Sequence, residues 1–332
     1  MPEAGPEWLH EAGIGEDRAA LVRDGQIIAV RIEWAEPLRT GLVAEAQLVA
    51  KAAGSKRGTV RFADGAEALV DSLPGNVTEG QKLTVRVTRA AIAERGRTKL
   101  AQTRAVNESP RPAPSLLDEL RASGYRLRNL PVTDRSLDAA GWNDVLDEAL
   151  SGTIAFPGGS LTISPTPAMT LIDVDGTLPP RALALAAIPA IAAALGRLDI
   201  AGSVGIDFPT IEAKADRQAV DAALGDALAD WRGERTAING VGFVQLVSRL
   251  ERPSLIARFA RFPAAAAARM LLRRAERVDD PGVLLLTAHP RVRAAVRAEW
   301  EAELIRRTGR TIRWQEQPAL ALGAGFAQAV ER

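Results

Sequence analysis

The chain changes its pattern of apolar residues at one proline-rich segment, residues 107–116 (NESPRPAPSL). Before this segment, short runs in which apolar and polar residues alternate are bounded by Gly, Asp or Pro, which is typical of β-strands. From residue 175 onward, apolar strand-like runs alternate with longer stretches that repeat at helical spacing. The sequence therefore predicts a mixed α+β protein in which an all-β region precedes an α/β region.

The all-β region begins with a predicted hairpin at residues 14–34, where two strand-like runs flank Asp24-Gly25, a pair typical of hairpin turns. Strand-like segments then continue over residues 40–104. Regularly spaced short strands are typical of a small barrel or sandwich.

The second half predicts short helices over 116–150 and three strand-like runs over 152–174. Helices are then predicted at 180–198, 216–231, 264–278 and 291–309, and strands at 201–208, 241–248, 282–288 and 311–317.

Composition excludes several classes of site. The chain has no cysteine, so it has no disulfide, no thiolate nucleophile and no Cys-ligated zinc. Its two histidines, His10 and His289, argue against a His-rich metal centre. The first twenty residues lack the apolar core of a signal peptide, and the longest apolar stretch, 182–195, contains Pro189 and is short for a membrane span. We therefore expect a cytoplasmic protein that does not associate with a membrane.

The predicted strands between Lys51 and Arg104 are locally basic, although the net charge of the chain is only +1. A five-stranded barrel with one basic face resembles an oligonucleotide-binding (OB) fold. The alternative is that exposed strand positions simply need charged residues. Such folds stack bases on aromatic rings, and only Phe62 is available for that role in this segment.

Two predicted strands of the α/β region end in aspartate. Asp173 follows Leu171-Ile172, Asp175 comes two residues later, and Asp207 follows the run at 204–206. The carboxyl end of a buried strand is where α/β folds present catalytic groups, and neighbouring strands lie about 4.8 Å apart. Two such carboxylates can share a divalent cation, and oxygen ligands suit Mg²⁺ or Mn²⁺. The alternative is structural, because Asp-Gly at a strand end is often only a turn.

Taken in order, these segments resemble the ribonuclease E/G family of bacterial endoribonucleases along most of the chain. The most specific similarity lies in LIDVDG at 171–176 and GIDF at 205–208. GFVQLV at 242–247, RPSL at 252–255 and the C-terminal segment from 283 are also similar to the family.

The resemblance implies an OB-type RNA-binding barrel inserted in a ribonuclease-H-like and deoxyribonuclease-I-like α/β catalytic region, followed by a small α/β domain. The implied parts are the first ribonuclease-H-like strands (14–37), the barrel (38–106), a linker with the rest of the ribonuclease-H-like part (107–165), the deoxyribonuclease-I-like part (166–258) and the C-terminal domain (259–332).

The implied activity is Mg²⁺-dependent cleavage of single-stranded RNA that leaves 5′-phosphate ends. Asp173 and Asp207 would be catalytic and, with Asp175, would hold the metal. The implied RNA contacts are Arg61, Phe62, Arg97, Lys99 and Arg104.

The chain departs from the family pattern at several points. The segment after the barrel is too short for the family's sensor domain for RNA 5′-monophosphates. The zinc link between subunits is impossible without cysteine, so any homo-oligomer would form by other means. Asp175 occupies a position where the family carries Asn, and the following glycine-rich loop is shortened. These departures support a second hypothesis, a catalytically inactive RNA-binding or scaffold protein that retains the fold.

Overall fold

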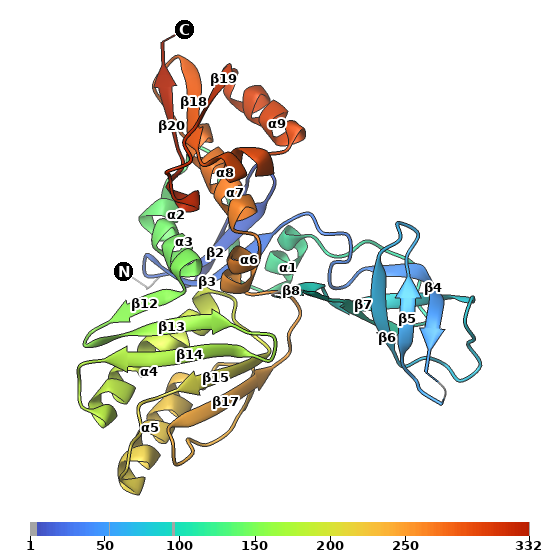
Figure 1. Ribbon diagram of the computed structural model, residues 1–332, viewed down its shortest axis with the longest axis vertical. Coiled ribbons are helices and arrows are strands. Elements are labelled where there is room, and N and C mark those ends of the chain that lie inside the picture. Colours follow the sequence, from blue (N-terminus) through green and yellow to red (C-terminus); the bar gives the residue numbers. More distant parts are fainter. Residues whose placement is uncertain (1–4, 53, 95–96, 332) are drawn as a thin grey trace.

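The computed structural model describes residues 5–52, 54–94 and 97–331. It contains mixed α and β structure, with a closed five-stranded barrel set apart from the rest of the molecule (Figure 1). The expected mixed α+β class with a small barrel is therefore confirmed at this level.

The first sheet has the strand order β11-β1-β2-β3, and its β2–β3 hairpin is the one that the sequence predicts. Asp24 and Gly25 both adopt positive φ (51° and 76°), which matches the twist of the two flanking strands. β1, which pairs with β2, has no counterpart among the strands predicted from the sequence. The strands are β1 (Glu7–Ala12), β2 (Asp17–Arg23), β3 (Gln26–Glu33) and β11 (Arg126–Asn129).

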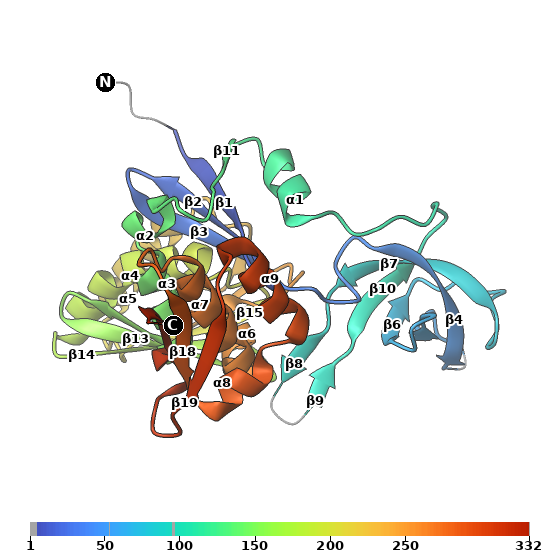
Figure 2. The same ribbon diagram turned by 90° about the horizontal axis from the view of Figure 1, so that it is seen from above.

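The barrel closes in the order β10-β6-β5-β4-β7, with apolar side chains such as Leu48, Val60 and Val85 filling its interior. A separate hairpin, β8–β9, extends from it toward α6 (Leu255–Arg261), which β8 contacts (Figure 2). The elements are β4 (Val43–Lys51), β5 (Gly58–Arg61), β6 (Glu67–Asp71), β7 (Lys82–Arg89), β8 (Ile92–Glu94), β9 (Arg97–Lys99), β10 (Ala101–Ala105) and the following helix α1 (Leu116–Ala122).

The second large sheet has the order β12-β13-β14-β15-β17-β16. The expected domain boundary after residue 165 falls in the turn between β13 and β14, which pair along their whole length in this one sheet. The strands are β12 (Thr153–Phe156), β13 (Gly159–Pro165), β14 (Thr170–Gly176), β15 (Ser203–Asp207), β16 (Gly233–Arg235) and β17 (Phe243–Ser248). The short helices before it are α2 (Ser136–Ala139) and α3 (Trp142–Ser151).

Helices α4 (Pro180–Arg197) and α5 (Lys214–Ala227) cover one face of this sheet. α4 also contacts β3, so one hydrophobic core joins the two sheets. In the described part of the chain, α4 alone has the length and apolar composition of a membrane-crossing helix. Seven of its side chains, Leu183 and Ile191 among them, are buried in the core.

The C-terminal part packs a three-stranded sheet, β19-β18-β20, against helices. The helix predicted at 291–309 is two helices. The backbone of Val296 is extended and ends the first helix, while the Val296 side chain is buried. The elements are α6 (Leu255–Arg261), α7 (Pro263–Glu276), β18 (Val283–Ala288), α8 (Pro290–Ala295), α9 (Ala298–Thr308), β19 (Ile312–Glu316), η1 (Leu322–Ala324) and β20 (Phe326–Val330).

A buried carboxylate ties the first sheet to α7. Glu11, which is 2% exposed, accepts hydrogen bonds from Arg18 (2.5 Å), Arg273 (3.0 Å) and Arg277 (2.5 Å). Asp138 accepts further hydrogen bonds from Arg273 (2.8 Å) and from Arg277. Charges buried this deeply are tolerated only when they are paired and hydrogen-bonded.

A stack of alternating arginine and tryptophan side chains makes a second junction. The guanidinium carbon of Arg269 lies 3.9 Å from the ring centroid of Trp34 and 4.4 Å from that of Trp300. Arg258 and Arg297 cover the outer faces of these rings at 4.9 Å and 5.1 Å. Burial lowers the pKa of Arg269 to about 10, so its charge is retained at neutral pH. The stack joins the end of β3 to α6, α7 and α9.

We predict that Glu11→Gln lowers the free energy of unfolding by about 3 kcal/mol or more, because it leaves buried guanidinium groups without their counter-charge. Urea denaturation followed by circular dichroism measures this. The matched control is Glu299→Gln, whose side chain is 65% exposed and 3.7 Å from Arg297. We expect a change below about 0.5 kcal/mol for this control. Equal losses in the two variants would contradict the assigned role of Glu11.

Candidate active site

The structure brings Asp173, Asp175 and Asp207 together on the large sheet. β14 and β15 are parallel neighbours, and their register places Asp173 directly beside Asp207. Asp175 lies two residues farther along β14 and therefore points to the same face as Asp173. All three residues are exposed.

The side-chain alternation of the strands decides which face carries these carboxylates. Ile172, Val174 and Ile206 point to the opposite face, where they are at most 5% exposed in the core beneath α4 and α5. Successive side chains of a strand alternate between faces, so the aspartates must lie on the face away from these helices.

The two aspartates belong to a row of side chains that crosses four strands. Thr162 of β13 pairs with Asp173, and Phe243 of β17 pairs with Asp207. The Phe243 ring extends over Gly205, where an added Cβ would lie 2.6 Å from the ring. Phe243 is not among the site residues predicted from the sequence. Its only signal there is an aromatic residue at a strand start, which does not reveal its neighbours.

The carboxylates repel one another. Partial burial, together with the charges of Asp175 and Asp207, raises the pKa of Asp173 above its ordinary value. Within residues 5–52, 54–94 and 97–331, no Lys or Arg forms an ion pair with any of the three aspartates. The site is therefore a concentration of negative charge that a cation would relieve.

The donor atoms suit a magnesium ion that keeps part of its water shell. Among the described residues, no three His, Cys, Asp or Glu side chains converge closely enough to hold an ion by themselves. Mg²⁺, however, is usually held by one or two carboxylates, with water and substrate phosphate as its other ligands. Asp173 and Asp207 provide such a pair at the surface of the sheet.

The structure disperses the residues expected to contact RNA. Phe62 is 8% exposed in the barrel core, so the expectation that its ring offers a stacking surface is wrong. Arg61 is engaged by Glu67, whose carboxylate accepts hydrogen bonds at 3.0 Å and 2.7 Å. The side chain of Arg97 lies outside the described part of the structure, although its backbone belongs to β9.

Arg104 and Lys99 lie in different surroundings from Arg61. Arg61 and Arg104 pair with opposite ends of β6, at Glu67 and Asp71 respectively. Lys99 lies on the β8–β9 hairpin beside the α/β body. The expected contacts therefore do not form one continuous face of the barrel.

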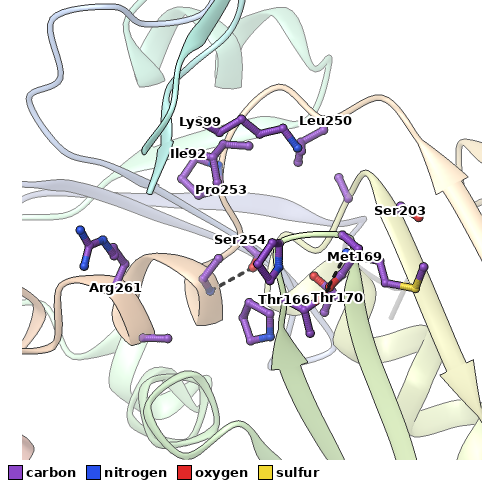
Figure 3. Close-up of a pocket in the computed structure, with 16 residues that line it drawn as sticks. Ile92, Lys99, Thr166, Met169, Thr170, Ser203, Leu250, Pro253, Ser254 and Arg261 are labelled. Carbon is purple, nitrogen blue, oxygen red and sulfur yellow. Dashed lines mark hydrogen bonds between the residues drawn. The ribbon is translucent and has the colours of Figure 1, made fainter. Parts of the chain in front are cut away.

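Lys99 lines a pocket of about 410 Å³ between the β8–β9 hairpin, the β13–β14 turn and α6, which we call the hairpin pocket. Figure 3 shows Lys99 extending across it toward Leu250, with Arg261 at its other side. Ser203 also lines it and accepts a hydrogen bond from Gln245 (3.2 Å). The lining residues include Ile92, Pro165, Thr166, Met169, Thr170, Pro253, Ser254 and Ala257.

The hairpin pocket and the aspartates share one face of β15. Ser203 and Asp207 are four residues apart on this strand, so their side chains lie on the same face, about 13 Å apart. The pocket and the carboxylates are thus two ends of one stretch of the uncovered sheet face.

No protein-family model and no curated protein matches the chain.

We predict that Asp173→Asn raises the stability of the metal-free protein at pH 7. A carboxyl whose pKa is raised in the folded state destabilises the fold while it is ionised, and this penalty disappears as the pH falls through its folded pKa. The gain should therefore shrink between pH 7 and pH 4, and it should stay below about 1 kcal/mol because the site is exposed. Thermal melts of both proteins in EDTA across this pH range measure it.

Asp226→Asn is the control, because Asp226 is exposed on α5, which covers the face of the sheet opposite to Asp173, Asp175 and Asp207. A gain at pH 7 that persists unchanged at pH 4, or a loss of stability, would contradict the assigned repulsion.

Proposed function

We propose that this protein is a Mg²⁺-dependent endoribonuclease of the ribonuclease E/G type that cleaves single-stranded RNA. The observation that carries the proposal is the register pairing of Asp173 with Asp207 on parallel strands. The resemblance of these two segments to the family adds the reaction. Hydrolysis would add water to the phosphorus and break its bond to the 3′ oxygen, which leaves a 5′-phosphate and a 3′-hydroxyl.

The aspartates would have two tasks in this reaction. Asp173 and Asp207 would hold the cation through one carboxylate oxygen each, and Asp175 would hold water or the cation from the same face. When bound, Mg²⁺ (or Mn²⁺) supplies positive charge for the phosphate and lowers the pKa of a coordinated water. Without a cation, three neighbouring carboxylates would repel the substrate, so activity should depend strictly on the metal.

The groups around the aspartates fit an extended nucleic-acid strand. Phe243, half-buried beside Asp207, offers a ring on which a base can stack. Lys99 and Arg261 in the hairpin pocket provide cations for neighbouring phosphates. The uncovered sheet face between these points leaves room for a single strand.

We also propose that the barrel is of the OB type and that the rest of the catalytic region combines a ribonuclease-H-like and a deoxyribonuclease-I-like part. The protein would be cytoplasmic, and any homo-oligomer would form without zinc.

A second candidate is a non-catalytic RNA-binding protein with the same fold. The lack, among the described residues, of a ready cluster of three metal ligands favours it. In this case the aspartates would carry no cation, and the barrel and the hairpin pocket would bind RNA without cleavage.

The test is cleavage of an unstructured, AU-rich RNA labelled at its 5′ end, with protein in excess, in Mg²⁺ and in EDTA. We predict internal cuts that require Mg²⁺ and that fall at least a hundredfold in rate in Asp207→Asn, because the cation loses one of its two anchors. Asp226→Asn should cleave at the wild-type rate. RNA binding without cleavage by the wild-type protein would establish the second candidate.

A further inference from the structure

Besides the hairpin pocket, the structure has a pocket of about 760 Å³ on the outer surface of the barrel. It lies between β7, β10, the segment 107–114 and Arg249, the residue that follows β17. We call it the arginine pocket, because Arg86, Arg104, Arg111 and Arg249 line it. Thr40, Thr88 and Asn107 add neutral polar groups to its wall.

The charges in this pocket are unbalanced. Glu108 is the one acidic residue among its described lining, against four arginines. It accepts hydrogen bonds from Arg86 and from Arg111 (2.7 Å). Arg249 has a partner outside the pocket, Glu251 at 3.3 Å. Arg104 is exposed and makes no ion pair or side-chain hydrogen bond with any residue that the structure describes.

The strand register makes this arrangement costly. Arg104 of β10 and Arg86 of β7 are directly opposite each other in the antiparallel ladder, and like charges at such positions destabilise a sheet. Arg111 lies near the same place, because Val43, the first residue of β4, pairs with both Arg86 and Arg111. Glu108 offsets part of this charge through Arg86 and Arg111, and the charge that remains at Arg104 is what an anionic ligand would balance.

The position of the pocket favours a long anion over a small one. Arg249 lines the arginine pocket, and the next residue, Leu250, lines the hairpin pocket. The hairpin pocket carries Lys99 and Arg261 and has no acidic residue in its described lining. The two cationic pockets are therefore lined by consecutive residues, 249 and 250, and Ser203 of the hairpin pocket lies on the same face of β15 as Asp207.

The junction between the pockets is held firmly. The backbone oxygen of Glu251 accepts hydrogen bonds from the Thr40 hydroxyl (2.7 Å) and from the Ala90 amide (3.1 Å). These bonds join the barrel to the segment between β17 and α6. The arginine pocket thus has a defined position relative to the aspartates, which an RNA strand that contacts both would require.

We propose that the arginine pocket binds the sugar-phosphate backbone of a single-stranded RNA before that strand enters the hairpin pocket. Guanidinium groups bind phosphate oxygens in pairs, and the pocket has no exposed aromatic ring in its described lining, so its contacts are with phosphates and not with particular bases. The identity of the strand rests on the proposed function, whereas the anion site rests on the arginines themselves.

The test measures binding without cleavage. Fluorescence anisotropy follows a labelled, unstructured RNA with full-length Asp207→Asn protein in EDTA, at salt concentrations from 50 to about 200 mM. Into this background we introduce Arg104→Gln together with Arg249→Gln, two exposed side chains whose loss leaves the core unchanged. The matched control is Arg126→Gln, on β11 and 81% exposed. Circular dichroism melts confirm that each variant is folded.

We expect the double variant to bind about tenfold more weakly, with a salt dependence shallower by about 1.4 in log–log slope, as expected for the loss of two phosphate contacts to a single strand. The control should bind as the parent does. RNAs with a 5′-hydroxyl and with a 5′-phosphate should lose the same affinity.

Unchanged affinity and slope in the double variant would overturn the proposal. A loss confined to the 5′-phosphorylated RNA would also overturn it, because the ligand would then be a terminal phosphate. The same assay with duplex RNA of equal length tests the single-strand assignment. If the parent protein binds the duplex more tightly than the single strand, and the double variant loses the same affinity for both, this assignment is wrong. Because the assay excludes the metal, its result is independent of whether the protein cleaves RNA.

Discussion

The arrangement of this molecule depends on one buried carboxylate. Glu11 lies on the first strand of the chain, and the guanidinium groups that bind it come from β2, from α7 and from Arg277, the residue after α7. Removal from water makes each of these charges costly alone, so the four side chains hold the first sheet against α7. α7 continues from α6, which forms a wall of the hairpin pocket and contacts β8. An ion cluster distant from the aspartates thus positions the hairpin of the barrel.

The candidate active site follows from the uncovered face of a sheet. α4 and α5 cover only one side of β14 and β15, so side chains such as Asp173, Asp175 and Asp207 on the other side reach solvent. Charged side chains can occupy those positions without a burial penalty, and parallel pairing brings two of them into register. The same uncovered face accepts the Phe243 ring because Gly205 has no side chain to obstruct it.

The overall charge of +1 conceals a separation of charge on the surface. Negative charge gathers at the end of β14 and β15, whereas the arginine pocket and the hairpin pocket are positive. A polyanion would be drawn to the barrel and repelled from the aspartates until a cation is present. Such a distribution makes binding and metal-dependent chemistry separable properties of the same molecule.

Local patterns were sufficient for the features that depend on neighbours in sequence. The Asp24-Gly25 turn, α4 and the end of β15 at Asp207 could be predicted, because turn geometry and apolar periodicity are local properties. Asp173 was expected at a strand end, but β14 continues past it to Gly176. The sequence missed β1, predicted one helix where Val296 divides two, and took Phe62 as exposed when strand parity turns it inward. The pairing of Asp207 with Phe243 and the meeting of Arg249 with Arg86 and Arg104 were decided only by the tertiary structure. These contacts join segments far apart in the chain, and their register depends on how whole sheets and the barrel pack, which no local pattern encodes.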